Sequence, residues 1–220
     1  MPSHQLDYQI LGDSAQAVEI LNNQTILTGT IDATPPEARL WPDTYEISRG
    51  ETRASVIARM RRARDENLAR LWAARSSATV VRTPEEAMIL ASIVEKETGL
   101  AADRGKIAGV FVNRLRIGMP LQTDPTVIYG LGDAFDGNLR KRDLQTDTPY
   151  NTYTRRGLPP TPIAMPGLAS LRAAVQPAAT PALYFVARGD GSSVFSADLA
   201  AHNRAVNQYQ RGGKPEAGTP

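Results

Sequence analysis

The sequence predicts an α+β fold, in which helices pack on a small, mostly antiparallel β-sheet and long loop-rich segments form a binding surface. Three observations lead to this prediction. Apolar residues recur at helical spacing in three segments between residues 52 and 117. Two short runs rich in β-forming residues, 182–187 and 193–197, flank a turn of Gly and Ser. Between the helices and this hairpin, Pro and Gly interrupt residues 119–167 so often that only short elements fit there.

Composition is that of an ordinary globular protein and excludes several kinds of chemistry. Of the 220 residues, 41% are hydrophobic and 22% are charged, which is enough apolar material for a normal core. Cysteine is absent, so disulfides, thiol nucleophiles and Cys-type zinc sites are excluded. The two histidines, His4 and His202, are too few for a multi-His metal site. No phosphate-binding loop or nucleophile elbow is present. We therefore expect neither a metal nor another cofactor.

The formal net charge of +2 is mildly basic, and the one dense cluster of positive charge is the four arginines of 59–64. Asp65 and Glu66 follow directly, so we interpret the cluster as a solvated helix face. Nucleic-acid binders usually gather Lys and Arg into a longer stripe, and we expect no nucleic-acid partner. Contact of 59–64 with an acidic polymer or an anionic lipid surface is the alternative.

We expect one main domain with a short segment on either side. Residues 14–31 predict a short helix followed by a strand, and we interpret 1–35 as the remnant of a preceding unit or as a linker. The main domain is predicted over 36–211, and the tail 212–220 is predicted to be disordered. No apolar run approaches the roughly 20 residues of a membrane span, and no signal peptide opens the chain. We expect a chain truncated at its N-terminus.

The main domain is predicted to begin with an extended segment and a long helix. Residues 39–47 are predicted to be extended, because Pro42 blocks a helix there, and to pack Trp41 and Tyr45. The helix is predicted from 52 to 75 on the spacing of its apolar residues.

The second helix has a clear beginning and end. Thr83 fits the N-cap, Pro84 fits the first helical position, and two glutamates fill the first turn. The helix is predicted to run to Thr98, with Gly99 as its stop. Three elements follow in the prediction, namely a helix over 103–117 whose apolar stripe carries a single arginine, the hairpin, and a last helix over 198–209.

One carboxylic acid lies on the apolar face of the second helix. The buried stripe of that helix is predicted to hold Leu90, Ile93 and Val94. Glu97 follows them at i+7, i+4 and i+3, so it falls at the centre of the stripe. Apolar surroundings and the negative end of the helix both raise the pKa of a carboxyl, as a general acid near neutral pH requires. Glu97 is therefore our candidate catalytic acid. The alternative is a frayed helix end, where Glu97 only pairs with an arginine such as Arg114.

Polar and aromatic side chains gather downstream of this acid, on segments stiffened by proline. Amides, hydroxyls and rings on rigid loops are suited to carbohydrate, because they bond sugar hydroxyls and stack on sugar faces. Asp124 has an open alternative as a mere N-cap of the helical turn after it. The candidate binding residues are Glu95, which faces away from Glu97 on the same helix, and Asn113, Arg114, Gln122, Thr123, Asp124, Tyr129, Tyr150, Asn151 and Tyr153.

Four blocks of the sequence resemble the endolytic murein transglycosylase family, also called YceG-like. The blocks stand in the family's order and are ASIVEKETG, GVFVNRLRIGMPLQTDPTVIYGLG, YNTYTRRGLPPTPIAMPG and LYFVARGDGSSVFSADLAAHN. The resemblance runs from about residue 40 to Asn203. It implies that the second Glu of the EKE triplet, Glu97, is the catalytic acid. It also implies an N-terminal membrane anchor and a small LysM-like domain before the catalytic domain; we expect both to be missing from this truncated chain, with 1–35 as a remnant of the LysM-like region or a linker.

The resemblance further implies the reaction. Members cut the β-1,4 bond between N-acetylmuramic acid and N-acetylglucosamine in peptidoglycan without water, leave 1,6-anhydro-muramyl ends, and thereby end nascent glycan strands. The implied place is the periplasmic face of the inner membrane. The implied partners are glycan strands and, beside them, cell-wall synthases (penicillin-binding proteins).

Three other functions stay open on the sequence. A lysozyme-like hydrolase would use water and would need a second carboxylate, for which Asp124 is the best candidate. A second possibility is a non-catalytic module that binds peptidoglycan or serves as a scaffold for cell-wall synthesis. The third is a binder of anionic surfaces through 59–64.

Overall fold

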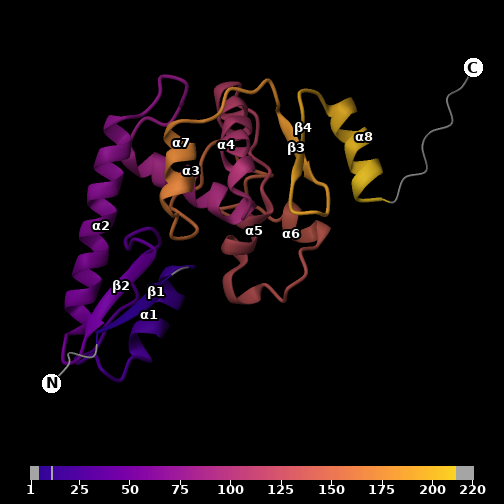
Figure 1. Cartoon of the computed structure of the whole chain (residues 1–220). Helices are drawn as coiled ribbons and strands as arrows, with labels where there is room; N and C mark the ends of the chain where they lie inside the picture. Colours follow the sequence, from indigo (N-terminus) through magenta and orange to yellow (C-terminus); the bar gives the residue numbers. More distant parts are fainter. Residues whose placement is uncertain (1–4, 11, 212–220) are drawn as a thin grey trace, which may run out of the picture.

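The computed structural model describes residues 5–10 and 12–211, and the tail predicted to be disordered, 212–220, lies outside the described residues. Figure 1 shows a small part with β1, α1 and β2 at one end and a larger part that holds α3 to α8. Helix α2 (Arg53–Ala73) runs from the small part along the side of the larger one. The α+β class is confirmed, and its β structure forms two separate antiparallel pairs of strands in the described residues.

The small part is a β–α–β unit. Strand β1 (Gln5–Ile10) pairs antiparallel with β2 (Asp43–Ser48). Helix α1 (Ser14–Asn22) lies between them in sequence, and the Asp13 side chain caps it by accepting the Gln16 N–H at 2.8 Å. The sheet joins residues from both sides of position 35, so the predicted N-terminal segment and the predicted main domain share a sheet.

The strand predicted after α1 does not form. Thr28 makes only an isolated bridge with Thr52. Arg53 contacts this segment instead, because its guanidinium donates to five backbone carbonyls at 2.7–3.1 Å, two at the end of α1 and three in the residues after it. These bonds satisfy carbonyls that strand pairing would otherwise satisfy. The five acceptors belong to Leu21, Asn22, Gln24, Leu27 and Gly29.

The predicted helices α2 and α3 are confirmed within two residues at each end. The Thr52 side chain caps α2, and Val56, Met60, Leu68 and Leu71 face the core as their spacing predicts. The extended segment predicted over 39–47 is also confirmed, because β2 begins within it and ends one residue beyond it. Its aromatic residues, Trp41 and Tyr45, are buried.

Helix α3 (Pro84–Glu97) is the centre of the larger part. Thr83 caps it through the Glu86 N–H at 3.1 Å. Every residue from 87 to 94 is buried, because α2, α4 and α7 pack around the helix. The sequence pattern predicted burial on one stripe only. A helix covered on all sides holds its C-terminal residues in a fixed place, which matters for Glu97.

Two helices that follow α3 in the sequence pack against it. Helix α4 (Ala101–Arg116) is the predicted one, whereas α7 (Leu168–Val175) was not predicted. Helix α7 spans only eight residues after a proline-rich loop, which is too short for a clear periodic pattern.

The remaining elements are short, as predicted for 119–167. Helix α5 (Asp124–Leu131), a 3-10 turn (Gly132–Ala134) and α6 (Lys141–Gln145) interrupt the loops. The predicted hairpin and last helix are confirmed: β3 (Tyr184–Ala187) pairs antiparallel with β4 (Ser193–Ser196), and α8 (Leu199–Tyr209) packs on both. In the described part of the chain, no helix is both long and apolar enough to cross a membrane.

Candidate active site

Glu97 is the last residue of α3, and its side chain is mostly buried. Its carboxyl accepts a hydrogen bond from the Thr123 hydroxyl. Burial raises the pKa of this carboxyl above its usual range, and the nearby Asp124 charge adds to the effect. The Thr123 hydrogen bond and the Arg114 charge act in the opposite direction without cancelling it. The raised pKa predicted for Glu97 is therefore confirmed.

Arg114 does not form an ion pair with Glu97 in the structure. Its guanidinium is directed at two backbone carbonyls instead, with Nε donating to Leu183 at 2.6 Å and an Nη donating to Leu121 at 2.5 Å. The Arg114 side chain thereby joins α4 to the hairpin and to the segment before α5. Arg114 lines the site and positions the segments that form its wall. The alternative in which Glu97 lies at a frayed helix end and only pairs with Arg114 is wrong, because α3 runs to Glu97 and the ion pair is not formed.

Thr123, the hydrogen-bond partner of Glu97, is held in place by a network of buried threonines. The Thr123 N–H donates to the Thr152 hydroxyl at 3.1 Å, and the Gln122 N–H donates to the Thr152 carbonyl at 3.0 Å. The Thr126 hydroxyl bonds the Thr123 carbonyl at 2.7 Å and lies 2.8 Å from the Thr152 hydroxyl. These bonds tie the segment before α5 to the loop after α6, so the Thr123 hydroxyl is held against Glu97.

Gln122 has a positive φ of 48°, which is uncommon for a residue other than Gly. Its backbone N–H is bonded to Thr152, and its side chain is exposed at the cleft. Such conformations cost free energy and persist where the surrounding structure imposes them. Here the result is an amide side chain presented beside the candidate acid.

Asp124 begins α5 and pairs with a tyrosine. The Tyr153 hydroxyl donates to Asp124 Oδ1 at 2.5 Å, and burial together with this bond raises the pKa of Tyr153. The alternative in which Asp124 serves only as an N-cap is wrong, because Thr123 holds the N-cap position. Asp124 is thus an exposed carboxylate beside Glu97, with one oxygen engaged.

The opposite wall comes from the hairpin and α8. Tyr184 of β3 stacks on His202 of α8 with ring centroids 5.2 Å apart, and the Arg114 guanidinium lies 5.4 Å from the Tyr184 ring. Burial, helped by the Arg114 charge, lowers the pKa of His202, so this imidazole is neutral near pH 7. Its Nδ1 is buried and has no hydrogen-bond partner among the described residues.

Together these groups line a cleft of about 600 Å³. Five of the predicted site residues reach it directly, and Thr123 reaches it through its bond to Glu97. The five are Glu97, Arg114, Gln122, Asp124 and Tyr153. The cleft thus combines an acid with a raised pKa, amide and carboxylate groups, and aromatic rings, a set of groups that suits the binding of carbohydrate.

Five other predicted residues lie outside this cleft, and three of them have structural partners. Glu95 accepts the Gly167 N–H at 3.1 Å and so holds the start of α7. The Asn113 amide donates to the carbonyls of residues 180 and 182. Asn151 is fully buried, and its amide donates to three carbonyls of the loop around it. These side chains do not line the cleft but hold the backbone of the segments around it in place.

The last two, Tyr129 and Tyr150, pack edge to face with ring centroids 4.9 Å apart, on the side of α5 away from the cleft residues. The Tyr150 hydroxyl lies 2.8 Å from the Thr161 hydroxyl. Tyr129 also lines a separate cavity.

Sequence reasoning did not single out the residues of the hairpin and α8 as parts of the site. Tyr184, His202 and Asn203 line the cleft. A signal was present for His202, because a polar ring stands at the buried side of a short amphipathic helix. Nothing in the local pattern, however, indicates that this helix closes onto a residue more than 100 positions earlier.

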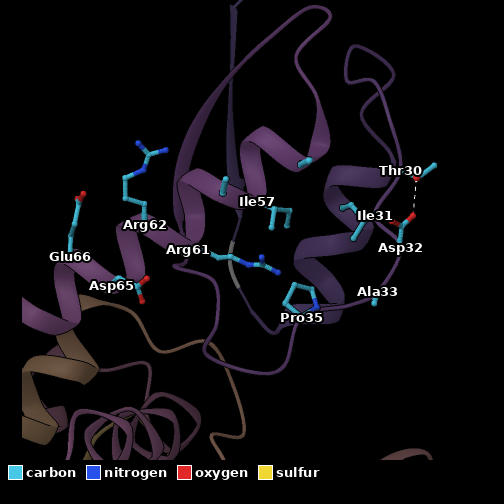
Figure 2. A pocket seen from close by; sticks show the side chains of 12 residues that line it. Thr30, Ile31, Asp32, Ala33, Pro35, Ile57, Arg61, Arg62, Asp65 and Glu66 are labelled. Atoms are coloured by element: carbon cyan, nitrogen blue, oxygen red, sulfur yellow. Dashed lines mark hydrogen bonds between the residues drawn. The ribbon is translucent and has the colours of Figure 1, made fainter.

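A larger cavity of about 660 Å³ lies far from these groups, between α2 and the loop 30–35. Figure 2 shows Arg61 and Arg62 on its wall beside Asp65 and Glu66. Two further arginines of the cluster are paired, Arg59 with Glu51 at 3.1 Å and Arg64 with Asp65 at 2.9 Å. Arg61 and Arg62 are exposed, as predicted for a solvated helix face. The prediction is wrong for Arg64, which is buried and whose Nε donates to the Ala38 carbonyl at 3.1 Å.

Comparison with known proteins gives one family and several relatives. The model of the YceG-like family matches residues 5–208. The endolytic murein transglycosylase of Bacillus subtilis (strain 168) is 40% identical over 175 residues, which cover 80% of this chain and 48% of that protein. The protein of the same name from Streptococcus pneumoniae (strain D39) is 34% identical over 178 residues, covering 79% and 32%. The chain thus spans about half or less of the length of these relatives.

A solved structure is also similar. A putative YceG-like protein from Listeria monocytogenes superposes with a TM-score of 0.66 at 36% sequence identity, over 84% of this chain and 57% of that one.

Proposed function

Since the chain belongs to the YceG-like family, we propose that it is the catalytic part of an endolytic lytic transglycosylase that cuts the glycan strands of peptidoglycan. The observation that carries the proposal is the Glu97 carboxyl, buried at the wall of a polar cleft with a raised pKa. A general acid must hold its proton at the working pH. The names of the relatives from B. subtilis and S. pneumoniae support murein as the substrate.

In the proposed reaction, protonated Glu97 donates its proton to the oxygen of the β-1,4 bond between N-acetylmuramic acid and N-acetylglucosamine. The bond breaks through an oxocarbenium-like transition state. The muramyl 6-hydroxyl then attacks the anomeric carbon, and the ionised Glu97 carboxylate takes the proton of that hydroxyl. The products are a 1,6-anhydro-muramyl end and a free 4-hydroxyl, and Glu97 is again protonated.

An internal nucleophile removes the need for a second catalytic carboxylate, because intramolecular attack is favoured over capture of water. We assign Gln122, Asp124 and Tyr153 to positioning the sugars. The engagement of Asp124 with the Tyr153 hydroxyl at 2.5 Å supports a positioning role. The Thr123 hydroxyl orients the Glu97 carboxyl by a hydrogen bond. On the opposite wall, the neutral His202 ring can stack on a sugar and its nitrogen can bond a sugar hydroxyl.

In the whole protein, such cuts within nascent strands would end their growth. We place this activity at the periplasmic face of the inner membrane, beside cell-wall synthases.

A hydrolase is the second candidate, because the charge of Asp124 acts on Glu97 and a second carboxylate is therefore at hand. Product analysis separates the two. Uncross-linked peptidoglycan strands are incubated with the chain and the ends are identified by mass spectrometry. Anhydro-muramyl ends, one water lighter than reducing ends, are expected. Reducing ends would establish the hydrolase, and strand binding without cleavage would favour a binding module.

A further inference from the structure

A second cavity lies on the other side of the same two helices that form the candidate active site. It measures about 350 Å³ and is lined by residues of the small part and of the larger part. Asp13 and Glu37 come from the small part. Lys96 comes from the end of α3, and Tyr129 with its neighbours comes from α5. We call it the rear cavity.

Neighbouring residues of α3 and α5 open into different cavities. Glu97 lines the cleft, whereas Lys96 lines the rear cavity. In the same way, Asp124 lines the cleft and Pro125 lines the rear cavity. The end of α3 and the start of α5 therefore separate the two cavities, and the rear cavity lies directly next to the residues that flank Glu97 and Asp124.

The chemistry of the rear cavity is also that of a sugar site. Tyr129 is partly exposed, and Ile128 and Ile163 supply apolar surface. Carboxylates accept hydrogen bonds from sugar hydroxyls and amide N–H groups, and an ammonium donates to an N-acetyl carbonyl.

The charged groups of the rear cavity do not neutralise each other by direct contact. Glu37 accepts the Ser14 N–H at 3.1 Å, and Asp13 accepts the Gln16 N–H at 2.8 Å, so both carboxylates are held by the start of α1. Lys96 forms no ion pair within 4.0 Å in the described residues, and its side chain is exposed. Its ammonium is thus available to a ligand.

From this arrangement we propose that the rear cavity is a second subsite, which binds an N-acetylated sugar unit of the same glycan strand. The inference rests on the proposed function. It explains what the small part contributes, since Asp13 and Glu37 complete a site that the larger part leaves half built. It also makes recognition depend on strand length, because only a strand long enough to reach past Glu97 gains the second contact.

Binding to an inactive protein tests the subsite without interference from cleavage. Glu97→Gln is titrated with peptide-free, uncross-linked glycan strands separated by length, and the Kd is measured by calorimetry for each length. We expect the Kd to tighten by about tenfold, equivalent to about 1.4 kcal/mol, once strands exceed a threshold length. Adding Lys96→Ala or Tyr129→Ala should remove this gain and leave short strands bound as before.

Lys141→Ala is the matched control, because Lys141 is an equally exposed lysine of α6 outside both cavities. It should keep the full dependence on length. A Kd that does not change with length, or that changes equally in all variants, would overturn the subsite and leave the proposed function standing. If no strand of any length bound, the proposed function and the subsite would both fall.

Discussion

At the scale of the residue, Glu97 is in an environment that opposes its charge. Burial and the Asp124 charge raise the pKa of its carboxyl, whereas the Thr123 hydroxyl and, less strongly, the Arg114 charge stabilise the ionised form. The proposed mechanism uses both protonation states in turn. The proton must be held before cleavage, and the carboxylate must exist long enough to accept a proton from the sugar hydroxyl.

The raised pKa of Glu97 has a consequence for stability. Between the usual carboxyl pKa and the raised one, the folded chain binds more protons than the unfolded chain, so the free energy of unfolding falls as pH rises. Glu97→Gln lacks this loss and keeps an oxygen for the Thr123 hydroxyl. We expect the variant to be more stable by about 1 kcal/mol at pH 7, which is about 2–4 °C in Tm, with the gap closing towards pH 4. A wild-type chain that is the more stable one at pH 7 would contradict this.

We expect Thr123 to determine the alkaline limit of the pH range over which the enzyme is active. Its hydroxyl favours the charged form of Glu97, so Thr123→Val should raise the pKa of Glu97 further. The acid would keep its proton to higher pH, and the alkaline limb of kcat/KM should move up by about one pH unit, since hydrogen bonds to charged groups are worth about 1.5 kcal/mol or more. Thr123→Ser retains the hydroxyl and should keep the wild-type limb. An unmoved or lowered limb in the Val variant would count against this role.

At the scale of the element, the packing of α4 against the segment that leads to the hairpin positions the wall of the cleft. Gly109 makes this packing possible. A Cβ at this residue would lie 2.5 Å from the Ala178 carbonyl oxygen and 2.8 Å from a methyl of Thr180. At Gly105, one turn earlier, a Cβ would meet the Ala178 Cβ at an ordinary 3.4 Å.

The two glycines therefore predict opposite effects of the same substitution. Gly109→Ala should lower the free energy of unfolding by about 1–3 kcal/mol, because the backbone must move apart. Gly105→Ala should raise it by about 0.5–1 kcal/mol, since Ala is the better helix former. Urea denaturation of both variants measures the difference. Equal changes in the two variants would show that the close approach at Gly109 does not constrain α4.

The sequence predicts elements best where local chemistry decides them. The Thr83 cap and the proline after it give the start of α3, and i+3, i+4 and i+7 spacing puts Glu97 on the apolar side. The strand expected after α1 does not form, and three backbone carbonyls of that segment instead accept hydrogen bonds from the side chain of Arg53, which is distant in sequence. The local conformational preferences of residues 23–31 cannot predict a contact with a residue outside that segment.

The candidate site likewise contains residues that local sequence predicts and residues that only tertiary packing brings there. Gln122, Asp124 and Tyr153 were found because polar residues cluster in one loop-rich stretch near the acid. Asn151 shares that composition, but its amide is consumed by carbonyls of its own loop. Tyr184 and His202 reach the cleft only because β3 packs on α4 and α8 packs on the hairpin, and this depends on tertiary packing.

At the scale of the whole molecule, the small part is joined to the rest through α2 and one loop. Arg53, in the first turn of α2, donates to five carbonyls of the small part. Met165, from the proline-rich loop before α7, is buried in the core of the small part beside Met60 and Ile47. These contacts hold the rear cavity in shape, since its lining comes from both parts.

Arg53→Lys should loosen the small part in particular, because one ammonium cannot replace a guanidinium that serves five carbonyls. We expect a loss of about 2 kcal/mol or more, and faster hydrogen exchange over 14–48 than over α3 and α4. Arg62→Lys is the control, because Arg62 is exposed on the same helix and forms no ion pair within 4.0 Å in the described residues. Uniformly faster exchange in all helices would contradict a selective role.

The central claim is that Glu97 is the general acid, and cleavage by Glu97→Gln tests it most directly. Glu95→Gln is the matched control, with the same change two residues away on α3, where the side chain holds the Gly167 N–H instead of facing the cleft. Both folded proteins are incubated with uncross-linked peptidoglycan strands, and the rate of new anhydro-muramyl ends is measured. We predict a fall of about 100-fold or more for Glu97→Gln and retention of most of the rate for Glu95→Gln. Cleavage by Glu97→Gln at the wild-type rate would contradict the account.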